Sequence, residues 1–401
     1  MDRKDIELAY GRMDGVVHKT PLERSETFSG MSGGEVHLKC ENLQKTGSFK
    51  ARGAYNMMLG LKSSGWAGNA VVACSAGNHA QGVAYAAKKL GYAATIVMPM
   101  TAPIAKISAT AGYGAKVELC GDCYDDTYEM ASRLAEKDGT ALIPAFDNAD
   151  IIAGQGTVGL EILGELPEAE VVLVPCGGGG LLAGVASYIK QVKPDVKIVG
   201  VQAEGADAVV SAFGKKEWAS TESVSTIADG IAVKMPGKLT VGLILRYVDE
   251  MVSVSDSEIS DAILLLLERC KQVVEPAGAA AVAAVLAGKV DIRGKKAVCV
   301  LSGGNIDVDF IQRIVERGLV QRGRRLQFTT TLPDRPGSLY RLCGIISENG
   351  GNILSLQHDR LNNKLGLNQT VVHAALEVGG TEHGRALIEA MNRAGYSAII
   401  D

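Results

Sequence analysis

The chain has 401 residues, of which 47% are hydrophobic and 21% charged, and its formal net charge is −4. This composition is typical of a globular protein with a large core and excludes a disordered chain. Aromatic residues make up only 5% and basic residues are not in excess, so we expect no nucleic-acid or membrane partner. The sequence has no apolar run of the ~18 residues that span a bilayer and no signal-peptide core, which indicates a cytoplasmic protein.

Short apolar runs alternate with alanine-rich helical segments through the first three quarters of the chain. The runs are rich in valine and isoleucine, as in strands that are buried on both faces of a parallel sheet. The alternation predicts an open α/β fold with right-handed crossovers. We expect strands at 70–74, 94–98, 171–174, 197–201 and 297–301, and helices at 81–90, 105–111, 124–137, 181–191 and 257–269.

The pattern changes after a basic, polar hinge at Arg322–Arg325. The remaining residues follow the order β-α-β-β-α-β of a ferredoxin-like module, which suits a segment of about 75 residues. We place the domain boundary at 319–325. The expected elements are strands at 326–332, 352–359, 367–378 and 396–400, and helices at 336–348 and 382–394.

Eight cysteines are scattered along the chain, several of them in apolar runs, and we expect buried free thiols. Cys120 and Cys123 form a lone CxxC pair. A zinc site would need a second pair or nearby histidines. We therefore predict two unrelated thiols, with a redox pair as the alternative, and no metal.

Four consecutive glycines, Gly177 to Gly180, separate an expected buried strand from an expected helix. Bare backbone N–H groups at the positive end of a helix form an anion cradle that suits phosphate. The loop lacks the lysine of a Walker A motif and the GxGxxG spacing of a dinucleotide fold. A tight turn needs only one or two glycines, so four of them favour a ligand.

Three further loops carry polar groups. Ser75–Gly82 follows a strand, and its N–H groups could hold a carboxylate at the start of the next helix. In Lys45–Gly53, Ser48 could cap a helix whose first turn contains Lys50, and a cation there is disfavoured by the helix dipole. A depressed pKa would suit a nucleophilic amine, whereas the alternative is a solvated surface lysine. The fourth loop, Leu301–Asn305, follows the last strand, at the sheet edge where open α/β folds bind ligands.

Together with Glu275-Pro-Ala-Gly278, these motifs resemble those of threonine dehydratases. These are pyridoxal-phosphate enzymes of fold type II, the tryptophan-synthase-β type. The resemblance implies a catalytic domain at 1–318 with a smaller subdomain near 44–146. Residues 326–401, with Asp334-Arg-Pro-Gly337 before a helix, resemble an ACT domain, a regulatory amino-acid-binding module, and 319–325 would be the linker.

The resemblance also implies the activity. A carbon–nitrogen lyase of this family would convert L-threonine to 2-oxobutanoate and ammonia by β-elimination, with L-serine as a poorer substrate. Lys50 would bind pyridoxal 5'-phosphate covalently and then act as the base on the substrate Cα. The enzyme would be a homo-oligomer, a tetramer by resemblance.

Other site residues are implied in the same way. Phe49 would pack beside the cofactor ring, Asn78 would bond its 3'-hydroxyl, and Ser302 would face its pyridine nitrogen. The phosphate would be bound by Gly177, Gly178, Gly179, Gly180 and the N–H of Leu181. The substrate carboxylate would be held by Ser75, Ala76, Gly77, Asn78 and His79, and a possible amino-acid effector by Gly337, Ser338 and Asn352.

Three alternatives stay open. A serine racemase of the same fold needs a second hydroxyl base where this chain has Ala76, and of its metal-binding acids only Glu204 is matched, since Val210 stands at the later position. A non-catalytic amino-acid sensor would not need Lys50. The C-terminal module could also serve only to hold subunits together, and the sequence leaves both the effector and a biosynthetic or catabolic role open.

Overall fold

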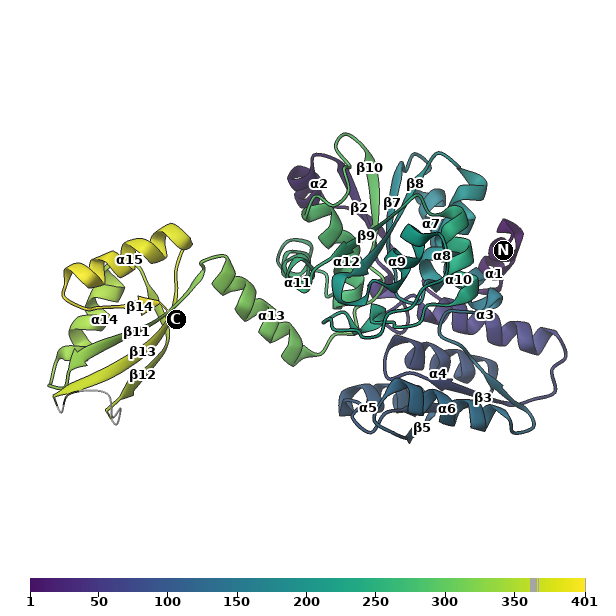
Figure 1. The fold of residues 1–401 in the computed structure, drawn as a ribbon, viewed down its shortest axis with the longest axis horizontal. Helices are drawn as coiled ribbons and strands as arrows, with labels where there is room; N and C mark the ends of the chain where they lie inside the picture. Colours follow the sequence, from purple (N-terminus) through teal and green to yellow (C-terminus); the bar gives the residue numbers. More distant parts are fainter. Residues whose placement is uncertain (361–365, 367, 401) are drawn as a thin grey trace. The chain divides into compact units, whose positions relative to one another are not determined.

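The structure, a computed structural model, describes residues 1–360, 366 and 368–400. It divides into two compact units, Met1–Asp307 and Val308–Asp401 (Figure 1). Among the helices of the described residues, none is long and apolar enough to cross a membrane.

The larger sheet of the first unit has six strands in the order β1-β2-β10-β7-β8-β9. Only β1 runs antiparallel to its neighbour. Every residue of β7 is buried, as expected for a valine-rich strand inside a parallel sheet covered by helices. The strands are β1 (Leu22–Arg24), β2 (Glu35–Lys39), β7 (Val171–Pro175), β8 (Lys197–Ala203), β9 (Glu250–Val254) and β10 (Lys296–Val300).

The helices around this sheet lie on both of its sides in Figure 1, with α2 and α12 opposite α7 and α8. α11 continues into a π-helical turn, Leu266–Cys270, and short 3-10 turns occupy Glu41–Leu43, Glu204–Ala206 and Asp229–Ile231. The helices are α1 (Arg3–Arg12), α2 (Glu26–Ser32), α7 (Ala149–Glu165), α8 (Gly180–Val192), α9 (Ala208–Lys215), α10 (Lys238–Tyr247), α11 (Asp256–Leu265) and α12 (Pro276–Leu286).

A second, fully parallel sheet has the order β5-β4-β3-β6. Its strands lie inside the range 44–146, where the sequence predicts the smaller subdomain. The elements are α3 (Lys50–Ser63), β3 (Ala70–Cys74), α4 (Asn78–Leu90), β4 (Ala93–Met98), α5 (Ile104–Gly112), β5 (Lys116–Leu119), α6 (Tyr124–Ala135) and β6 (Thr140–Leu142).

Glycines bring α3, α7 and α8 into close backbone contact. A Cβ on Gly154 of α7 would lie 2.6 Å from the Cα of Gly53 in α3, and one on Gly156 would lie 2.9 Å from the carbonyl oxygen of Gly184 in α8. Real side chains do not approach so closely, so larger residues would push the helices apart. α3 begins at Lys50 and α8 begins at the four-glycine loop. By packing against both helices, α7 therefore fixes their N-terminal ends relative to each other.

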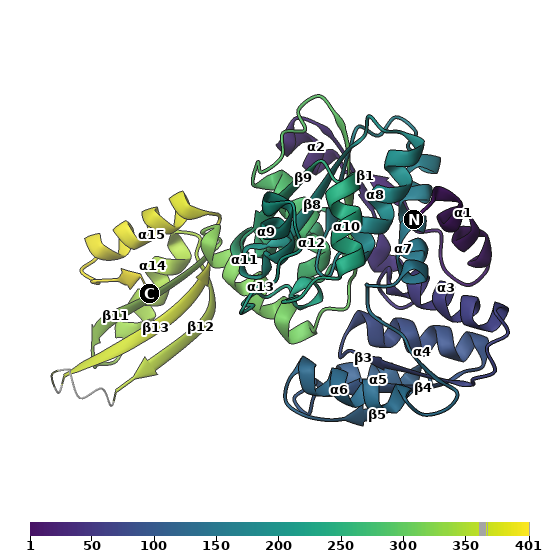
Figure 2. The same ribbon diagram turned by 45° about the vertical axis from the view of Figure 1, so that its right-hand side comes forward.

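In the second unit, a four-stranded antiparallel sheet has the order β12-β13-β11-β14, and α14 and α15 lie on the same face of it (Figure 2). Phe328, Leu342, Ile346 and Leu387 fill the core between them. The elements are α13 (Val308–Gln321), β11 (Arg325–Pro333), α14 (Ser338–Glu348), β12 (Asn352–Asp359), β13 (Gln369–Glu377), α15 (Thr381–Arg393) and β14 (Ile399–Ile400).

This arrangement confirms the predicted fold class: open parallel sheets followed by a ferredoxin-like module. The first unit ends at Asp307, whereas the catalytic domain was expected to extend to residue 318. α13 runs through 319–321, the first three residues of the predicted linker, and belongs to the second unit. Leu367, which was expected to begin a strand, lies outside the described residues.

Candidate active site

Lys50 is the first residue of α3, and its amine donates a hydrogen bond of 2.8 Å to the carbonyl oxygen of Ala145. The helix N-cap is Phe49, so the assignment of Ser48 as the cap was wrong. The backbone explains why: Ser48 pairs with Gly303 in an isolated β-bridge. The buried Ser48 hydroxyl has no hydrogen-bond partner among the described residues.

Burial lowers the pKa of Lys50 to about 8, against an opposing attraction from Glu275. The positive end of α3 favours the neutral amine as well. The uncharged amine, which is the nucleophilic form, is therefore far more populated near neutral pH than in an ordinary lysine. This agrees with the depressed pKa expected from the sequence, and the Phe49 ring centroid lies 5.2 Å from the same amine.

The four-glycine loop is packed tightly against Phe146. A Cβ on Gly178 would overlap the Phe146 ring, one on Gly180 would lie 3.0 Å from the Cβ of Phe146, and Gly179 has a φ of +94°. The glycines are thus required by packing and backbone conformation, so their number alone does not indicate a ligand. The ligand signal lies instead in the N–H groups of Gly177 to Leu181, which have no backbone acceptor in the described chain.

The segment Ala145–Asp147 connects Lys50 to this loop. Ala145 accepts the hydrogen bond from Lys50, and Phe146 packs on the glycines. Asp147 accepts hydrogen bonds from the first N–H groups of α10, where the Thr240 hydroxyl also donates to the carbonyl oxygen of Gly178 at 2.6 Å. The sequence analysis missed this segment, because a short polar stretch before a helix gives no signal for contacts to a distant loop.

The start of α4 forms a second set of free donors. The N–H groups of Ala76, Asn78 and His79 have no acceptor in the described residues, while that of Gly77 donates to the Ser75 hydroxyl at 3.1 Å. Burial lowers the pKa of His79 to about 3, and the neutral ring bonds the carbonyl oxygen of Ile143 at 2.8 Å. His79 is thus a packing residue, and its contribution to anion binding is restricted to its backbone.

Ser302 follows β10 and lies beside the start of α3. Its carbonyl oxygen accepts a hydrogen bond from the N–H of Phe49 at 3.2 Å. The residue is only 3% exposed, and its hydroxyl makes no hydrogen bond within the described part of the chain. A hydroxyl without a partner in the protein can donate to or accept from a ligand.

Asn78 contacts two residues that the sequence analysis quoted in motifs without a role. Its Nδ2 donates to Glu275 at 2.6 Å, and its Oδ1 accepts from Asn305 at 2.6 Å. Burial raises the pKa of Glu275 to about 8, and the charge of Asp229 adds to the effect. Glu275 is therefore largely protonated at neutral pH. The sequence signal that could have singled out Glu275 is its position directly before Pro276, which marks the start of a helix.

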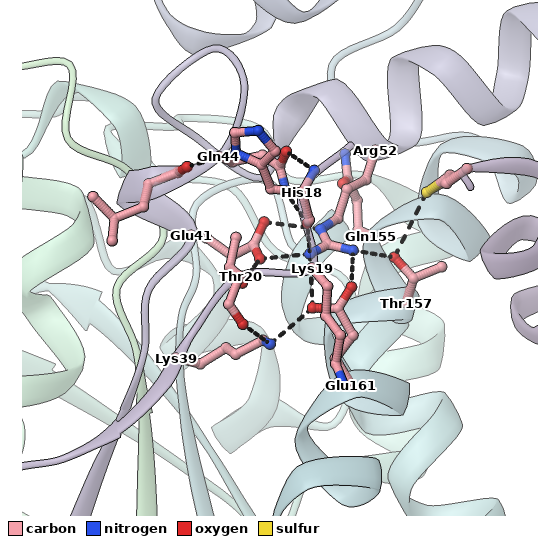
Figure 3. A network of polar contacts seen from close by, with 12 residues as sticks. His18, Lys19, Thr20, Lys39, Glu41, Gln44, Arg52, Gln155, Thr157 and Glu161 are labelled. Carbon is pink, nitrogen blue, oxygen red and sulfur yellow. Dashed lines mark hydrogen bonds and ion pairs between the residues drawn. The ribbon is translucent and has the colours of Figure 1, made fainter. Parts of the chain in front are cut away.

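Next to the site, Arg52 lies at the centre of a buried charge network (Figure 3). It makes paired hydrogen bonds of 2.7 and 2.9 Å to Glu41 and again to Glu161, and a longer one of 3.2 Å to Thr157. Lys39 adds a second cation 2.8 Å from Glu161. The four charged side chains are at most 1% exposed. Lys39 also pairs with the partly exposed Glu165 at 3.1 Å. These ion pairs tie β2, α3 and α7 together.

In the second unit, a cavity of about 320 Å³ lies at the start of α14. Gly337 and Ser338 line it, and the buried Ser338 hydroxyl has no partner in the described residues. Asp334 and Arg360 pair at its edge at 3.2 Å. Asn352 is not part of this lining and bonds Glu377 instead, so the cavity contains two of the three effector candidates.

The eight cysteines are unpaired, and Cys40, Cys74, Cys176 and Cys299 are buried, as expected from the sequence. No cluster of three potential metal ligands occurs among the described residues.

These groups fit a cofactor that carries an aldehyde, a phosphate and an aromatic ring. The Lys50 amine can bond the aldehyde, and the free N–H groups at the start of α8 can bind the phosphate. Asn78 and the unpaired Ser302 hydroxyl supply polar groups for a heteroaromatic ring. Both lie near the start of α3, since Ser302 bonds Phe49 and α4 packs against Lys50 through Gly82.

Residues 13–303 match the family model described as pyridoxal-phosphate dependent enzyme. An L-threonine ammonia-lyase of Thermotoga maritima is 48% identical over 397 residues, which cover 99% of this chain and 98% of that relative. A solved threonine deaminase from T.th. is 40% identical with a TM-score of 0.73, over 77% of this chain and 99% of that one. A maize serine racemase is 34% identical with a TM-score of 0.75, over 80% and 98% of the two chains.

Proposed function

Because this chain belongs to the family of pyridoxal-phosphate dependent enzymes, we propose that it is an L-threonine ammonia-lyase. It converts L-threonine to 2-oxobutanoate and ammonia by β-elimination and acts on L-serine as a secondary substrate. The observation that carries the proposal is the 48% identity to a threonine ammonia-lyase across nearly the whole of both chains. The direct test is release of 2-oxobutanoate and ammonia from L-threonine, measured with purified protein and added pyridoxal phosphate.

Bound pyridoxal phosphate supplies an electron sink for the carbanion that forms when the substrate loses its Cα proton. The residues of this chain supply binding, orientation and proton transfer. Lys50 would hold the cofactor through its amine and, as a neutral amine, would take the Cα proton of the substrate. The lowered pKa makes that neutral form available near neutral pH.

The loops that surround Lys50 would bind the phosphate, the substrate carboxylate and the pyridine ring. The N–H groups of Gly177 to Leu181 at the start of α8 would hold the phosphate. In the Ser75–His79 loop, the free N–H groups of Ala76, Asn78 and His79 would hold the substrate carboxylate. Ser302 faces the pyridine nitrogen. A hydroxyl, unlike a carboxylate, does not force protonation of this nitrogen, and the weaker electron withdrawal suits elimination rather than transamination.

Serine racemase is the nearest alternative, and the maize enzyme shows that the fold accommodates it. Racemisation needs a second acid or base on the opposite face of the substrate. Ala76, half-buried between Ser75 and Gly77, has no proton to exchange.

We therefore expect L-serine to give pyruvate and ammonia with little D-serine. Chiral chromatography of the reaction mixture, beside a coupled pyruvate assay, measures both products. Ala76→Ser adds a hydroxyl at this position and should raise the ratio of D-serine to pyruvate. D-serine formed by the unmodified enzyme as fast as pyruvate would refute the one-base mechanism.

A non-catalytic sensor is the alternative from another class. Such a protein has no need of a half-buried lysine with a lowered pKa. The colour of the purified protein distinguishes an ammonia-lyase from a non-catalytic sensor, because covalently bound pyridoxal phosphate is yellow.

We assign the second unit to amino-acid sensing by an ACT domain at 326–401, with 319–325 as the linker. The cavity at the start of α14 supports this, because the partnerless Ser338 hydroxyl in its lining suits a carboxylate. Gly337 adopts a left-handed φ of +85°, which lets a ligand approach the backbone. Asn352 is the third proposed contact. The oligomer is a cytoplasmic homotetramer in this proposal, and an effector would mark a role in isoleucine biosynthesis.

Truncation after Gly323, which removes the proposed ACT domain and leaves α13, should preserve threonine turnover and abolish any response to amino acids. The T.th. threonine deaminase supports this design, since nearly all of that chain aligns to only 77% of this one. In the full chain, Ser338→Ala removes one hydroxyl and should weaken the response without changing turnover in its absence. Isoleucine and valine are the probes, measured by kinetics and thermal shift. An equally responsive truncated enzyme, or a full chain that no amino acid affects, would contradict the assignment.

A further inference from the structure

The orientation of the Asn78 amide is determined by a chain of hydrogen bonds that begins at a backbone carbonyl. Asn305 donates from Nδ2 to the carbonyl oxygen of Thr46 at 2.8 Å and to Oδ1 of Asn78 at 2.6 Å. A backbone carbonyl can only accept, so the NH₂ group of Asn305 must face Thr46. Both of its hydrogens are then used, and it is the oxygen of Asn78 that faces Asn305.

The other end of the Asn78 amide is fixed by Glu275. Nδ2 of Asn78 donates to Oε1 of Glu275 at 2.6 Å. This bond does not depend on the protonation state of Glu275, because a carboxyl oxygen accepts in both forms. An amide nitrogen has two hydrogens, and the second hydrogen of Asn78 has no partner in the described residues.

Tight packing leaves the hydrogen-bonded side chains of Asn78 and Glu275 little room to move. A Cβ on Gly303 would overlap Oε1 of Glu275 and lie 3.1 Å from Nδ2 of Asn78, and one on Gly230 would lie 3.5 Å from the same Oε1. The N–H of Glu275 donates to the carbonyl oxygen of Gly303 at 3.0 Å, and the side chain is buried. Two glycines therefore leave room for the acceptor, and side chains at these positions would crowd it.

We propose that Asn305 and Glu275 are positioning residues that hold the Asn78 amide with one N–H directed at the ring oxygen of the cofactor. The inference rests on the proposed function, in which Asn78 contacts that oxygen. A reversed amide would present a carbonyl oxygen in place of the donor, and two acceptors repel. Asn305 and Glu275 thereby decide whether the ring oxygen receives a hydrogen bond, which controls its ionisation.

Asn305→Asp tests the inference with almost no change of shape. A carboxylate cannot donate to Thr46 or Asn78, so the Asn78 amide is expected to rotate and turn its NH₂ toward position 305. The bound cofactor should then show a changed ratio of its visible to near-ultraviolet absorbance, and the apoprotein should bind pyridoxal phosphate at least about tenfold more weakly, as for loss of one hydrogen bond to a charged group. Glu275→Gln keeps an acceptor oxygen and should change both quantities less.

Asn42→Asp is the matched control. Asn42 is also a buried amide that bridges two acceptors, Gln272 at 2.8 Å and the carbonyl oxygen of Val273 at 3.1 Å. Its replacement should lower the melting temperature while leaving the absorbance ratio and cofactor affinity unchanged. The inference fails if Asn305→Asp has the spectrum and affinity of the wild type, or if Asn42→Asp alters both equally. A wild-type protein without cofactor absorbance would instead overturn the proposed function itself.

Discussion

Lys50→Ala should fold, lose the yellow colour of the bound cofactor and lose at least about 10⁴-fold in threonine turnover. The lysine is both the attachment point of the cofactor and the base on the substrate, and a positioned base alone contributes about 10²–10⁴-fold. Removing a half-buried amine that makes one hydrogen bond, to Ala145, should leave the melting temperature of the apoprotein near that of the wild type. Absorbance spectra, turnover and thermal unfolding of the same preparation measure the three effects.

Lys45→Ala is the matched control, because Lys45 is exposed in the same loop. It should keep colour and turnover. Lys50→Ala enzyme that remains yellow and active would show that another lysine holds the cofactor.

Arg52→Ala should lower the free energy of unfolding of the first unit by about 3–5 kcal/mol, the usual cost of removing one partner from a buried ion pair. Glu41 and Glu161 would then both lose their guanidinium partner in a buried site, and Lys39 contacts only Glu161 of the two. Arg52→Lys keeps a charge but cannot make both paired contacts, so its effect should be intermediate.

Urea unfolding followed by tryptophan fluorescence measures this effect, because Trp66 and Trp218 both lie in the first unit. Arg293→Ala is the control: Arg293 pairs with Asp291 at the surface, where both side chains are more than half exposed, and its loss should have little effect. If the two variants unfold at the same urea concentration, the buried network does not stabilise the unit as proposed.

The sequence was sufficient for elements with a strong local pattern. The strands at Ala70 and Val171 were found because continuous valine-rich runs are typical of buried parallel strands. α7 was missed because Gly154 and Gly156 weaken a helical pattern. The two glycines are needed for close contacts to α3 and α8, which the local sequence does not reveal. α13 was also missed, although the apolar spacing of Val308–Gln321 at helical period was an available signal.

The candidate site was predictable where one loop carries the chemistry and unpredictable where partners are distant. A cation at a helix start is unusual, but the role of Lys50 came from the resemblance to threonine dehydratases and not from its position alone. Arg52 and Glu161 are 109 residues apart, and no local pattern connects them. The bond between Asn78 and Glu275 likewise spans 197 residues and depends on how the two sheets are assembled.

Borohydride reduction identifies which lysine amine holds the cofactor. Reduction converts the bond between cofactor and lysine into a stable link, and mass spectrometry of the digested protein then identifies the modified peptide. The account predicts a single modified lysine, Lys50. A cofactor found on any other lysine, or protein that stays unmodified after reduction of a yellow preparation, would contradict it.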